Sequence, residues 1–265
     1  MAYIKGLEGT FDKAATLYDK MRPGYSDELY RAIFDYAHIG EGSNALEVGP
    51  GTGQATLPML KTGCALTAVE YGENLASRLK EKFSGYPGFT VITDKFEDAP
   101  LEKDNYDLVY SATAFHWIPE KEGYEKVYSI LKRGGVFARF ANRPRPGKDD
   151  PALQAEIEDL YDRYYYPYHG KTREPVQEFT EEKARELSEI ALRYGFTDLR
   201  YHVFHRERVF TAGEYIGLLG TYSDHIAIAE PVRKEFFAAI ERAIDARGGT
   251  ITIHDTLDLE LARKN

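Results

Sequence analysis

The sequence predicts an α/β protein with a doubly wound, mainly parallel seven-stranded sheet, whose last strand is antiparallel, and a helical cap. Three observations support this prediction. Apolar strand-like runs alternate with helix-like stretches in the first half, which is typical of a parallel sheet covered on both faces. A glycine-rich turn directly follows the first of these runs. Residues 250–264, "TITIHDTLDLELARK", alternate polar and apolar side chains, which is typical of a strand with one solvated face.

The elements of the first half follow in order. Two helices are expected before the sheet, at 10–21 and 26–38, and the second begins with "SDEL", a serine N-cap with acids in the first turn. Five strands are then expected at 44–48, 65–70, 89–93, 106–113 and 135–140. The helices between them are expected at 54–63, 73–83 and 119–135. The last of these ends with Lys132 and Arg133 before a double glycine, as a helix C-terminus prefers.

The pattern changes after residue 141. "RPRPGKDDP" predicts a proline-rich break, and helix-like stretches follow near 150–163 and 180–194. A strand is expected at 199–210, and "TAGE" at 211–214 is a capping box for the next helix. A further helix is expected at 230–246, before the final strand. We therefore expect four parts: an N-terminal helical lid (1–41), a core of alternating strands and helices (42–141), a helical insertion (142–198), and a segment that completes the sheet with its own helical insertion at about 211–247 (199–265).

Composition excludes several classes of protein. The chain has 265 residues, and no apolar run approaches the roughly 18–20 residues of a membrane span. No signal peptide is apparent and the chain has one cysteine, Cys64, so a cytoplasmic location is expected. A net charge of −9 argues against nucleic-acid binding. His202 and His205 point to opposite faces of the expected strand, so we expect no metal site.

The stretch "ALEVGPGTGQAT" (45–56) places three glycines within five positions after a strand. A strand, a glycine turn and a helix form a binding site for the polar part of a nucleotide-like ligand. The dinucleotide fingerprint would require a third glycine at position 54, which is Gln54. The spacing Gly49, Gly51, Gly53 therefore differs from that fingerprint.

Together with four further motifs, this turn resembles the class I S-adenosylmethionine-dependent methyltransferases of the type 11 small-molecule group. The matching segments are "LEVGPGTG" (46–53), Glu70 at the end of "LTAVE", "TDKFEDAPL" (93–101), "YDLVYSATAFHWI" (106–118) and "ILKRGGVFARF" (130–140). Within the group, "FDKAATLYDKMRPGYS" and "FHW" are similar to relatives of the trans-aconitate methyltransferases. The resemblance covers residues 10–141 well and 199–262 loosely.

The resemblance implies a bound S-adenosylmethionine that is converted to S-adenosylhomocysteine, with residues 42–141 as the cofactor-binding core and the insertion 142–198 as the acceptor pocket. A carboxylate at Glu70, at the end of the second strand, can accept both ribose hydroxyls. Gly49 and Gly51 would lie against the methionine part, and which acid contacts adenine stays open, as does a plain core role for Phe96. The expected cofactor-binding residues are Tyr18, Arg22, Glu47, Gly49, Gly51, Gly53, Glu70, Tyr71, Asp94, Phe96, Glu97, Ser111 and Ala112.

The expected reaction is methyl transfer to a small-molecule acceptor, with a carboxylic acid favoured by the resemblance and by the arginines of "NRPRPGK". His116 is the candidate catalytic residue, either orienting the acceptor or taking its proton, with a purely structural imidazole as the alternative. The candidate acceptor-binding residues are Trp117, Arg143, Tyr165 and Tyr168. Two other functions stay open: a cofactor-binding partner or sensor without turnover, and a nucleotide-dependent oxidoreductase. The oligomeric state is not predicted.

Overall fold

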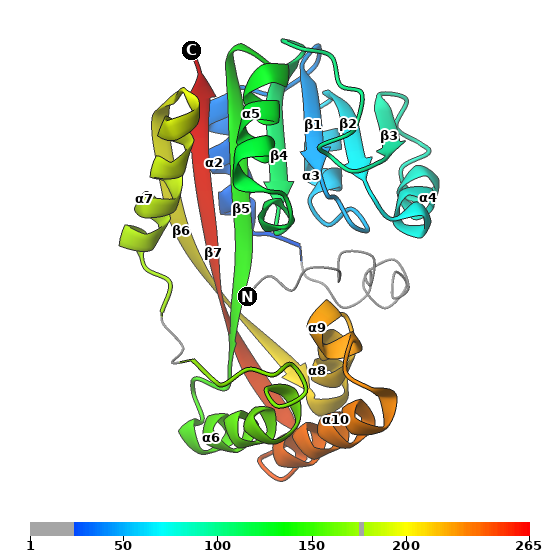
Figure 1. Cartoon of the computed structure of the whole chain (residues 1–265), viewed down its shortest axis with the longest axis vertical. Helices are drawn as coiled ribbons and strands as arrows, with labels where there is room; N and C mark the ends of the chain where they lie inside the picture. Colours follow the sequence, from blue (N-terminus) through cyan, green and yellow to red (C-terminus); the bar gives the residue numbers. More distant parts are fainter. Residues whose placement is uncertain (1–23, 175–177) are drawn as a thin grey trace.

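The computed structural model describes residues 24–174 and 178–265, and the expected helix at 10–21 lies outside them, as do Tyr18 and Arg22. The described residues form two lobes that three long strands join (Figure 1). We call the lobe with the sheet and its covering helices the core lobe. The smaller lobe, built from helices within residues 151–165 and 212–245 at the far end of the long strands, is the helical lobe.

The sheet has seven strands in the described part of the chain, as predicted, and they lie in the order β3-β2-β1-β4-β5-β7-β6. The first five strands are parallel to one another, and β7 is antiparallel to both β5 and β6. The strands are β1 (Asn44–Val48), β2 (Ala65–Glu70), β3 (Phe89–Thr93), β4 (Tyr106–Ala112), β5 (Leu131–Pro146), β6 (Phe196–Thr211) and β7 (Thr250–Lys264).

Helices cover both faces of the sheet, because the alternating side chains of its central strands are buried on both sides. On one face, α2 (Asp27–Ala37), α3 (Thr56–Leu60) and α4 (Glu73–Lys82) pack into a core that includes Leu66 and Leu108. On the other face, α5 (Glu120–Ile130) and the turn η4 (Ile190–Tyr194) pack around Val109 and Phe137. The short turn η2 (Phe115–Trp117) follows β4, and α7 (Glu181–Glu189) precedes η4.

Strand β5 continues through the segment that the prolines suggested was a break. Residues 142–146 extend past the end of β4 and pair only with β7. The Asn142 amide donates to the Thr113 hydroxyl on one side of β5, and the Gly147 amide donates to the Thr252 carbonyl of β7 on the other side. Because backbone nitrogens alternate in direction along a strand, those of Pro144 and Pro146 point the same way as that of Asn142, toward the unpaired edge. A proline costs no ladder hydrogen bond at such positions.

Strand β7 also differs from expectation. The alternation predicted one solvated face, but residues 257–262 are buried on both faces, because β7 lies between β5 and β6 in the sheet. The acids of its inner half are paired across the strands: Arg139 donates to Glu260 at 3.1 Å, and Arg143 donates to Asp258 at 2.6 Å. Polar residues in this strand therefore mark buried ion pairs and not a face in water.

The helical lobe has its own apolar core. It contains α6 (Pro151–Leu160), the π-helical turn η3 (Tyr161–Tyr165), α8 (Ala212–Leu219), α9 (Ser223–Ile226) and α10 (Glu230–Asp245). Phe236 and Ile240 of α10 pack there against Ile251 and Ile253 at the start of β7. The predicted capping box begins α8, where the Glu214 amide donates to the Thr211 hydroxyl and the Glu214 carboxylate accepts from the Thr211 amide. Among the described helices, none is both long and apolar enough to cross a membrane.

Candidate active site

A cavity of about 340 Å³, the first cavity, opens at the carboxyl ends of the parallel strands. The strand order reverses between β1 and β4 at this point, which is where ligands bind in open α/β sheets. The predicted cofactor residues that line it are Gly49, Gly51, Glu70, Tyr71, Asp94, Phe96, Glu97 and Ala112.

The glycines of the loop after β1 have different structural roles. Gly49, Gly51 and Gly53 all have positive φ, at 67°, 62° and 86°, which glycine adopts without strain. A Cβ on Gly49 would lie 2.6 Å from the Cβ of Ala114, and a Cβ on Gly53 would lie 2.5 Å from the Phe83 ring. Gly49 and Gly51 line the first cavity, whereas Gly53 is needed for packing against α4 and does not line it.

Glu70 places a carboxylate in the wall of the first cavity. It is the last residue of β2, and its two carboxylate oxygens accept from the backbone amides of Gly51 at 3.0 Å and of Gly72 at 2.9 Å. The side chain is therefore fixed by the glycine loop on one side and by the start of α4 on the other. A carboxylate held in this way at the end of the second strand fits the ribose-binding role expected for it.

Glu47 lies in the core behind the loop instead of in the first cavity. It is fully buried, and its carboxylate accepts from the hydroxyls of Thr56 at 2.6 Å and Tyr110 at 2.8 Å, while its other oxygen has no partner. Burial raises the pKa of Glu47 to about 7. Ser111 is also fully buried and donates to the backbone carbonyl of Val48 at 3.0 Å. Both side chains lock β1 to its neighbours, and neither residue lines the first cavity.

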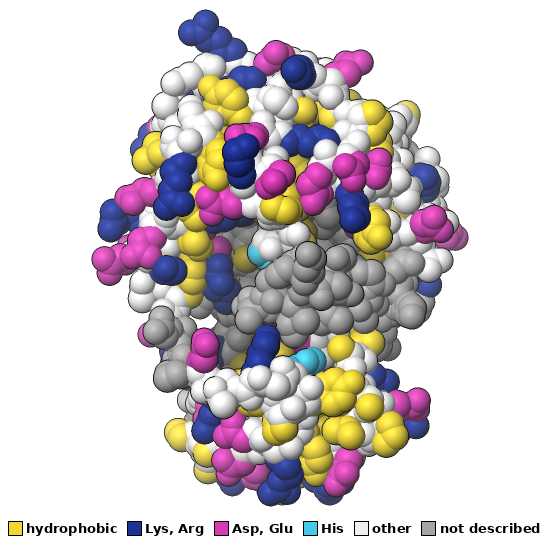
Figure 2. Space-filling model, in the orientation of Figure 1, with side chains coloured by type: hydrophobic (Ala, Val, Ile, Leu, Met, Phe, Trp, Pro, Cys, Tyr) yellow, Lys and Arg dark blue, Asp and Glu magenta, His cyan; other side chains and the backbone are white. Residues whose placement is uncertain are grey.

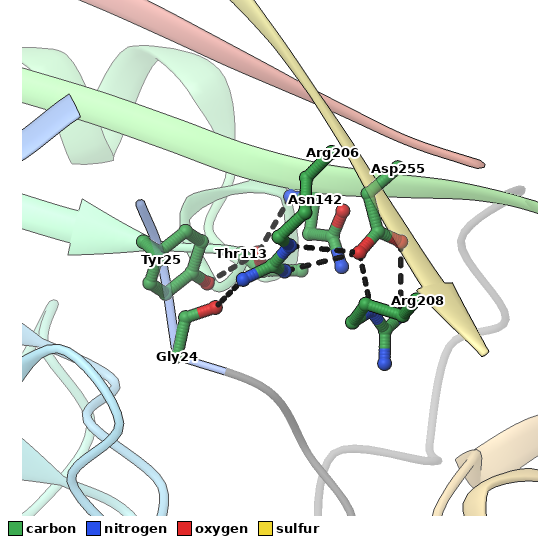
Figure 3. A network of polar contacts seen from close by, with 7 residues as sticks. All are labelled: Gly24, Tyr25, Thr113, Asn142, Arg206, Arg208 and Asp255. Carbon is green, nitrogen blue, oxygen red and sulfur yellow. Dashed lines mark hydrogen bonds and ion pairs between the residues drawn. The ribbon is translucent and has the colours of Figure 1, made fainter. Parts of the chain in front are cut away.

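Thr113 lies at the end of the first cavity that faces the helical lobe. It has a φ of 55°, which is a strained conformation for a β-branched residue and costs roughly 1–3 kcal/mol. Its amide donates to the carbonyl of Phe140 at 2.8 Å, and its hydroxyl lies 2.7 Å from the Tyr25 hydroxyl and accepts from the Asn142 amide at 3.2 Å (Figure 3). The surrounding structure thus holds the Thr113 hydroxyl at one fixed place in the cavity wall.

An arginine from β6 also reaches the first cavity. Asp255, which is almost fully buried on β7, pairs with both Arg206 and Arg208, and Arg206 also donates to the Gly24 carbonyl at 3.0 Å. Figure 3 shows that one guanidinium nitrogen of Arg208 points away from Asp255. Tyr222, from the helical lobe, lines the same end of the cavity. Sequence reasoning did not find Arg208 or Tyr222.

A second cavity of about 1130 Å³ adjoins the first, and Thr113, Asn142 and Pro144 line both. A hollow between the two lobes is visible in the space-filling view, with histidine and basic side chains at it (Figure 2). The cationic side chains that line the second cavity are Arg143, Arg145, Lys148, Lys183 and Arg206, and its acids are Glu178, Glu207 and Asp255.

The arginines of the second cavity differ in how they are held. Arg143 donates to the buried Asp258 and lies 4.1 Å from the centre of the Phe179 ring, so its position is fixed. The Arg145 guanidinium lies 3.8 Å from the Glu178 carboxylate, and its buried Nε has no hydrogen-bond partner among the described residues. An unsatisfied buried donor is costly, and a ligand acceptor in this cavity would satisfy it.

His116 lines the second cavity and not the first. Its side chain is exposed among the described residues, and partial burial together with the charges of Arg143 and Arg139 lowers its pKa to about 4. The imidazole is therefore neutral at pH 7.

The remaining candidate residues are divided between the lobes. Trp117 lines the first cavity and Arg143 the second. Tyr165 instead donates to Asp224 at 2.7 Å inside the helical lobe, and Tyr168 is exposed on its surface. Neither tyrosine lines either cavity, because η3 packs into the core of the helical lobe. Among the described residues no cluster of three or more His, Cys, Asp or Glu side chains could hold a metal ion.

Comparison with known proteins shows which family this chain belongs to. A family model described as a methyltransferase domain matches residues 46–138, which span β1 to the middle of β5. An uncharacterised methyltransferase of a Geobacillus species is 32% identical over 170 residues, which are 60% of this chain and 76% of that protein. The chain belongs to the methyltransferase family. An uncharacterised methyltransferase-like protein of Schizosaccharomyces pombe is 27% identical over 234 residues, 88% of this chain and 84% of its own length.

Solved structures agree on the fold of this methyltransferase. A protein of Anaeromyxobacter dehalogenans, provisionally assigned as a type II methyltransferase, superposes with a TM-score of 0.63 at 23% identity, covering 91% of this chain and 97% of its own. A phosphoethanolamine N-methyltransferase of Haemonchus contortus, in complex with S-adenosylhomocysteine, superposes with a TM-score of 0.55 at 12% identity, covering 96% of this chain and 57% of its own. The protein is a class I enzyme that depends on S-adenosylmethionine.

Proposed function

We propose that this methyltransferase binds S-adenosylmethionine along the first cavity and methylates a small organic acid that enters through the second. The observation that carries the proposal is the contact between the two cavities at Thr113, Asn142 and Pro144. A reaction between two bound molecules requires their reacting atoms to meet, and this junction is the place where ligands of the two cavities can do so.

The first cavity fits the cofactor. The Glu70 carboxylate offers acceptors for ribose hydroxyls, the loop at Gly49 and Gly51 lets the methionine part approach the backbone, and residues 94–97 line the end expected for adenine. When bound, the cofactor supplies an electrophilic methyl group. The chain's own residues then position the acceptor and exclude water, which is sufficient for an in-line displacement.

The second cavity fits an acidic acceptor. Five cationic side chains line it against three acids, and the unpartnered Nε of Arg145 provides a hydrogen-bond donor for a carboxylate. In this placement the acid group anchors the acceptor beside Arg143 and Arg145, and the atom that receives the methyl group reaches the Thr113 hydroxyl. Neutral His116 borders the acceptor but is too weak a base to be the main source of rate, because its pKa is far below the working pH.

The test is a product screen with carboxylic acids, each paired with its own primary amide. S-adenosylhomocysteine release and the methylated product are measured by mass spectrometry with the purified protein and S-adenosylmethionine. The proposal predicts methylation of at least one acid at ten or more times the kcat/KM of its amide. Equal turnover of acid and amide would contradict the acidic acceptor. Cofactor binding without turnover of any compound would favour the sensor alternative.

A further inference from the structure

The turn that lines the first cavity beyond β3 is held from outside by a lysine. Residues 95–99 form one helical turn, in which the amides of Asp98 and Ala99 donate to the carbonyl of Lys95 at 3.1 and 2.9 Å. The Asp94 side chain accepts from the Lys95 amide at 2.8 Å and so fixes the start of the turn. Among the described residues the amides of Phe96 and Glu97 have no acceptor, and both residues line the first cavity.

Lys126 fixes the other end of this turn. It lies on α5, and its ammonium group donates to the carbonyls of Glu97 at 2.8 Å and of Ala99 at 2.7 Å. The same group lies 5.4 Å from the centre of the Phe96 ring, which is buried beneath the turn and lines the first cavity. Lys126 itself does not line the cavity. Its hydrogen bonds thus connect a helix on the back of the sheet to the wall of the cofactor site.

We infer that Lys126 is a positioning residue for cofactor binding: it holds the turn 95–99 in the conformation that presents the amides of Phe96 and Glu97 to the adenine ring. The inference rests on the cofactor placement proposed above. We place no contact between Lys126 and the cofactor. Loss of the Lys126 ammonium group should therefore weaken the binding of every ligand that carries the adenosine part.

The charges around Lys126 provide a second, electrostatic explanation that can be separated from positioning. The carboxylates of Asp94, Glu97 and Asp98 surround the ammonium group, while burial lowers the pKa of Lys126. Removing the positive charge would make this end of the site more negative. That change would favour the sulfonium cation of S-adenosylmethionine over uncharged S-adenosylhomocysteine, whereas loss of positioning weakens both equally.

The experiment is a calorimetric titration of the full chain with S-adenosylmethionine, S-adenosylhomocysteine and 5′-methylthioadenosine. Lys126→Met keeps the apolar stem and removes the ammonium group, and Lys126→Gln is measured beside it should the first variant not fold. Lys121→Met is the matched control, since Lys121 lies on the same helix and pairs only with the exposed Glu125. Lys126→Arg tests rescue, because a guanidinium can reach both carbonyls.

We expect Lys126→Met to weaken all three ligands by about tenfold, Lys126→Arg by less than threefold and Lys121→Met by less than twofold. Unchanged affinity in Lys126→Met and Lys126→Gln, while Glu70→Ala loses binding, would overturn the inference. So would tighter binding of S-adenosylmethionine with unchanged affinity for S-adenosylhomocysteine and 5′-methylthioadenosine, which would identify an electrostatic effect. If Glu70→Ala binds as the wild type does, the cofactor placement itself is wrong.

Discussion

The two cavities are built in different ways. The first is formed by loops at the ends of four neighbouring parallel strands, and its wall combines the backbone of the glycine loop with Glu70 and several aromatic residues. The second is lined by long cationic side chains of β5, the loop after it, α7 and β6, together with residues of β7, and the pairing of these strands brings residues more than 100 positions apart together. The first is therefore a site encoded by local motifs, and the second depends on the register of three long strands.

The difference in construction suits the two cavities to different ligands. A site made from backbone and one fixed carboxylate suits a ligand that never changes, which is the cofactor. A site made from side chains on extended strands can vary with little effect on the fold, which suits the acceptor. If the comparison is correct, substitutions around the first cavity should change cofactor affinity, and substitutions around the second should change only acceptor kinetics.

Glu70→Ala should have the largest effect. It removes the carboxylate that accepts from Gly51 and Gly72, so we expect S-adenosylhomocysteine affinity to fall at least about 100-fold. Calorimetric titration measures the loss, and Glu73→Ala, an exposed acid at the start of α4, is the control. An affinity within threefold of wild type would place the cofactor elsewhere.

Glu47→Gln should change stability and leave cofactor affinity intact, although Glu47 and Glu70 lie at corresponding ends of adjacent strands. A buried acid with a raised pKa is stable while protonated, and its contribution is lost as pH rises from 4.5 through about 7. The wild type should therefore lose about 3 kcal/mol of unfolding free energy over this range relative to Glu47→Gln. Urea unfolding at pH 4.5, 6, 7 and 8 measures the difference, while S-adenosylhomocysteine affinity stays within twofold. Parallel stability curves for the two proteins would show that Glu47 is not the titrating group.

Thr113 belongs to both cavities, and two variants separate its hydroxyl from its strained backbone. Thr113→Val keeps the shape and the strain but removes the hydroxyl, so kcat should fall about 30-fold with cofactor affinity unchanged. Thr113→Ser keeps the hydroxyl and relieves the crowding of the branched side chain, so its kcat should stay within threefold of wild type. Initial rates of S-adenosylhomocysteine release provide the measurement. Equal rates for the two variants would show that the Thr113 hydroxyl does not contribute to kcat.

Arg145→Met tests the second cavity alone. Removing the Arg145 guanidinium takes an ion-pair partner only from the exposed Glu178, so the fold should be unaffected. We expect the KM for an acidic acceptor to rise about tenfold and the affinity for S-adenosylhomocysteine to stay unchanged. Arg143→Met is a poorer choice, since it would leave the buried Asp258 without its cation. A change in cofactor affinity would mean that the two cavities are not separate sites.

His116→Asn should have the smallest effect, a change in kcat of less than fivefold. An imidazole with a pKa near 4 is neutral across the working pH range and is a weak base there. Initial rates at pH 6, 7 and 8 check this expectation. A loss of 100-fold or more at all three pH values would restore His116 as the catalytic residue.

The same contrast explains how much the sequence could predict. Strands β1, β2 and β3 matched their predicted bounds, and the glycine loop, Glu70 and residues 94–97 were found because each is a short motif whose place in the fold follows from its neighbours. The burial of Glu47 behind the loop could not be predicted, because the pattern around a strand end does not show on which side of the sheet the side chain lies.

Residues of the junction could not be predicted in the same way. Arg208 and Asp255 are 47 positions apart, and their pairing depends on the register of β6 against β7, which no local pattern specifies. The prolines at 144 and 146 concealed the extension of β5, since a proline breaks a strand except at an unpaired edge. Tyr222 reaches the first cavity only because the helical lobe folds back beneath it.

The central claim is that the second cavity is the acceptor site, and a crystal structure with S-adenosylhomocysteine and 4-iodobenzoate tests it most directly. The anomalous signal of iodine locates the acid independently of any interpretation of its shape. The account predicts the nucleotide in the first cavity, with its ribose on Glu70, and iodobenzoate in the second cavity with its carboxylate on Arg145. Iodobenzoate bound elsewhere, with the second cavity filled only by solvent, would contradict it.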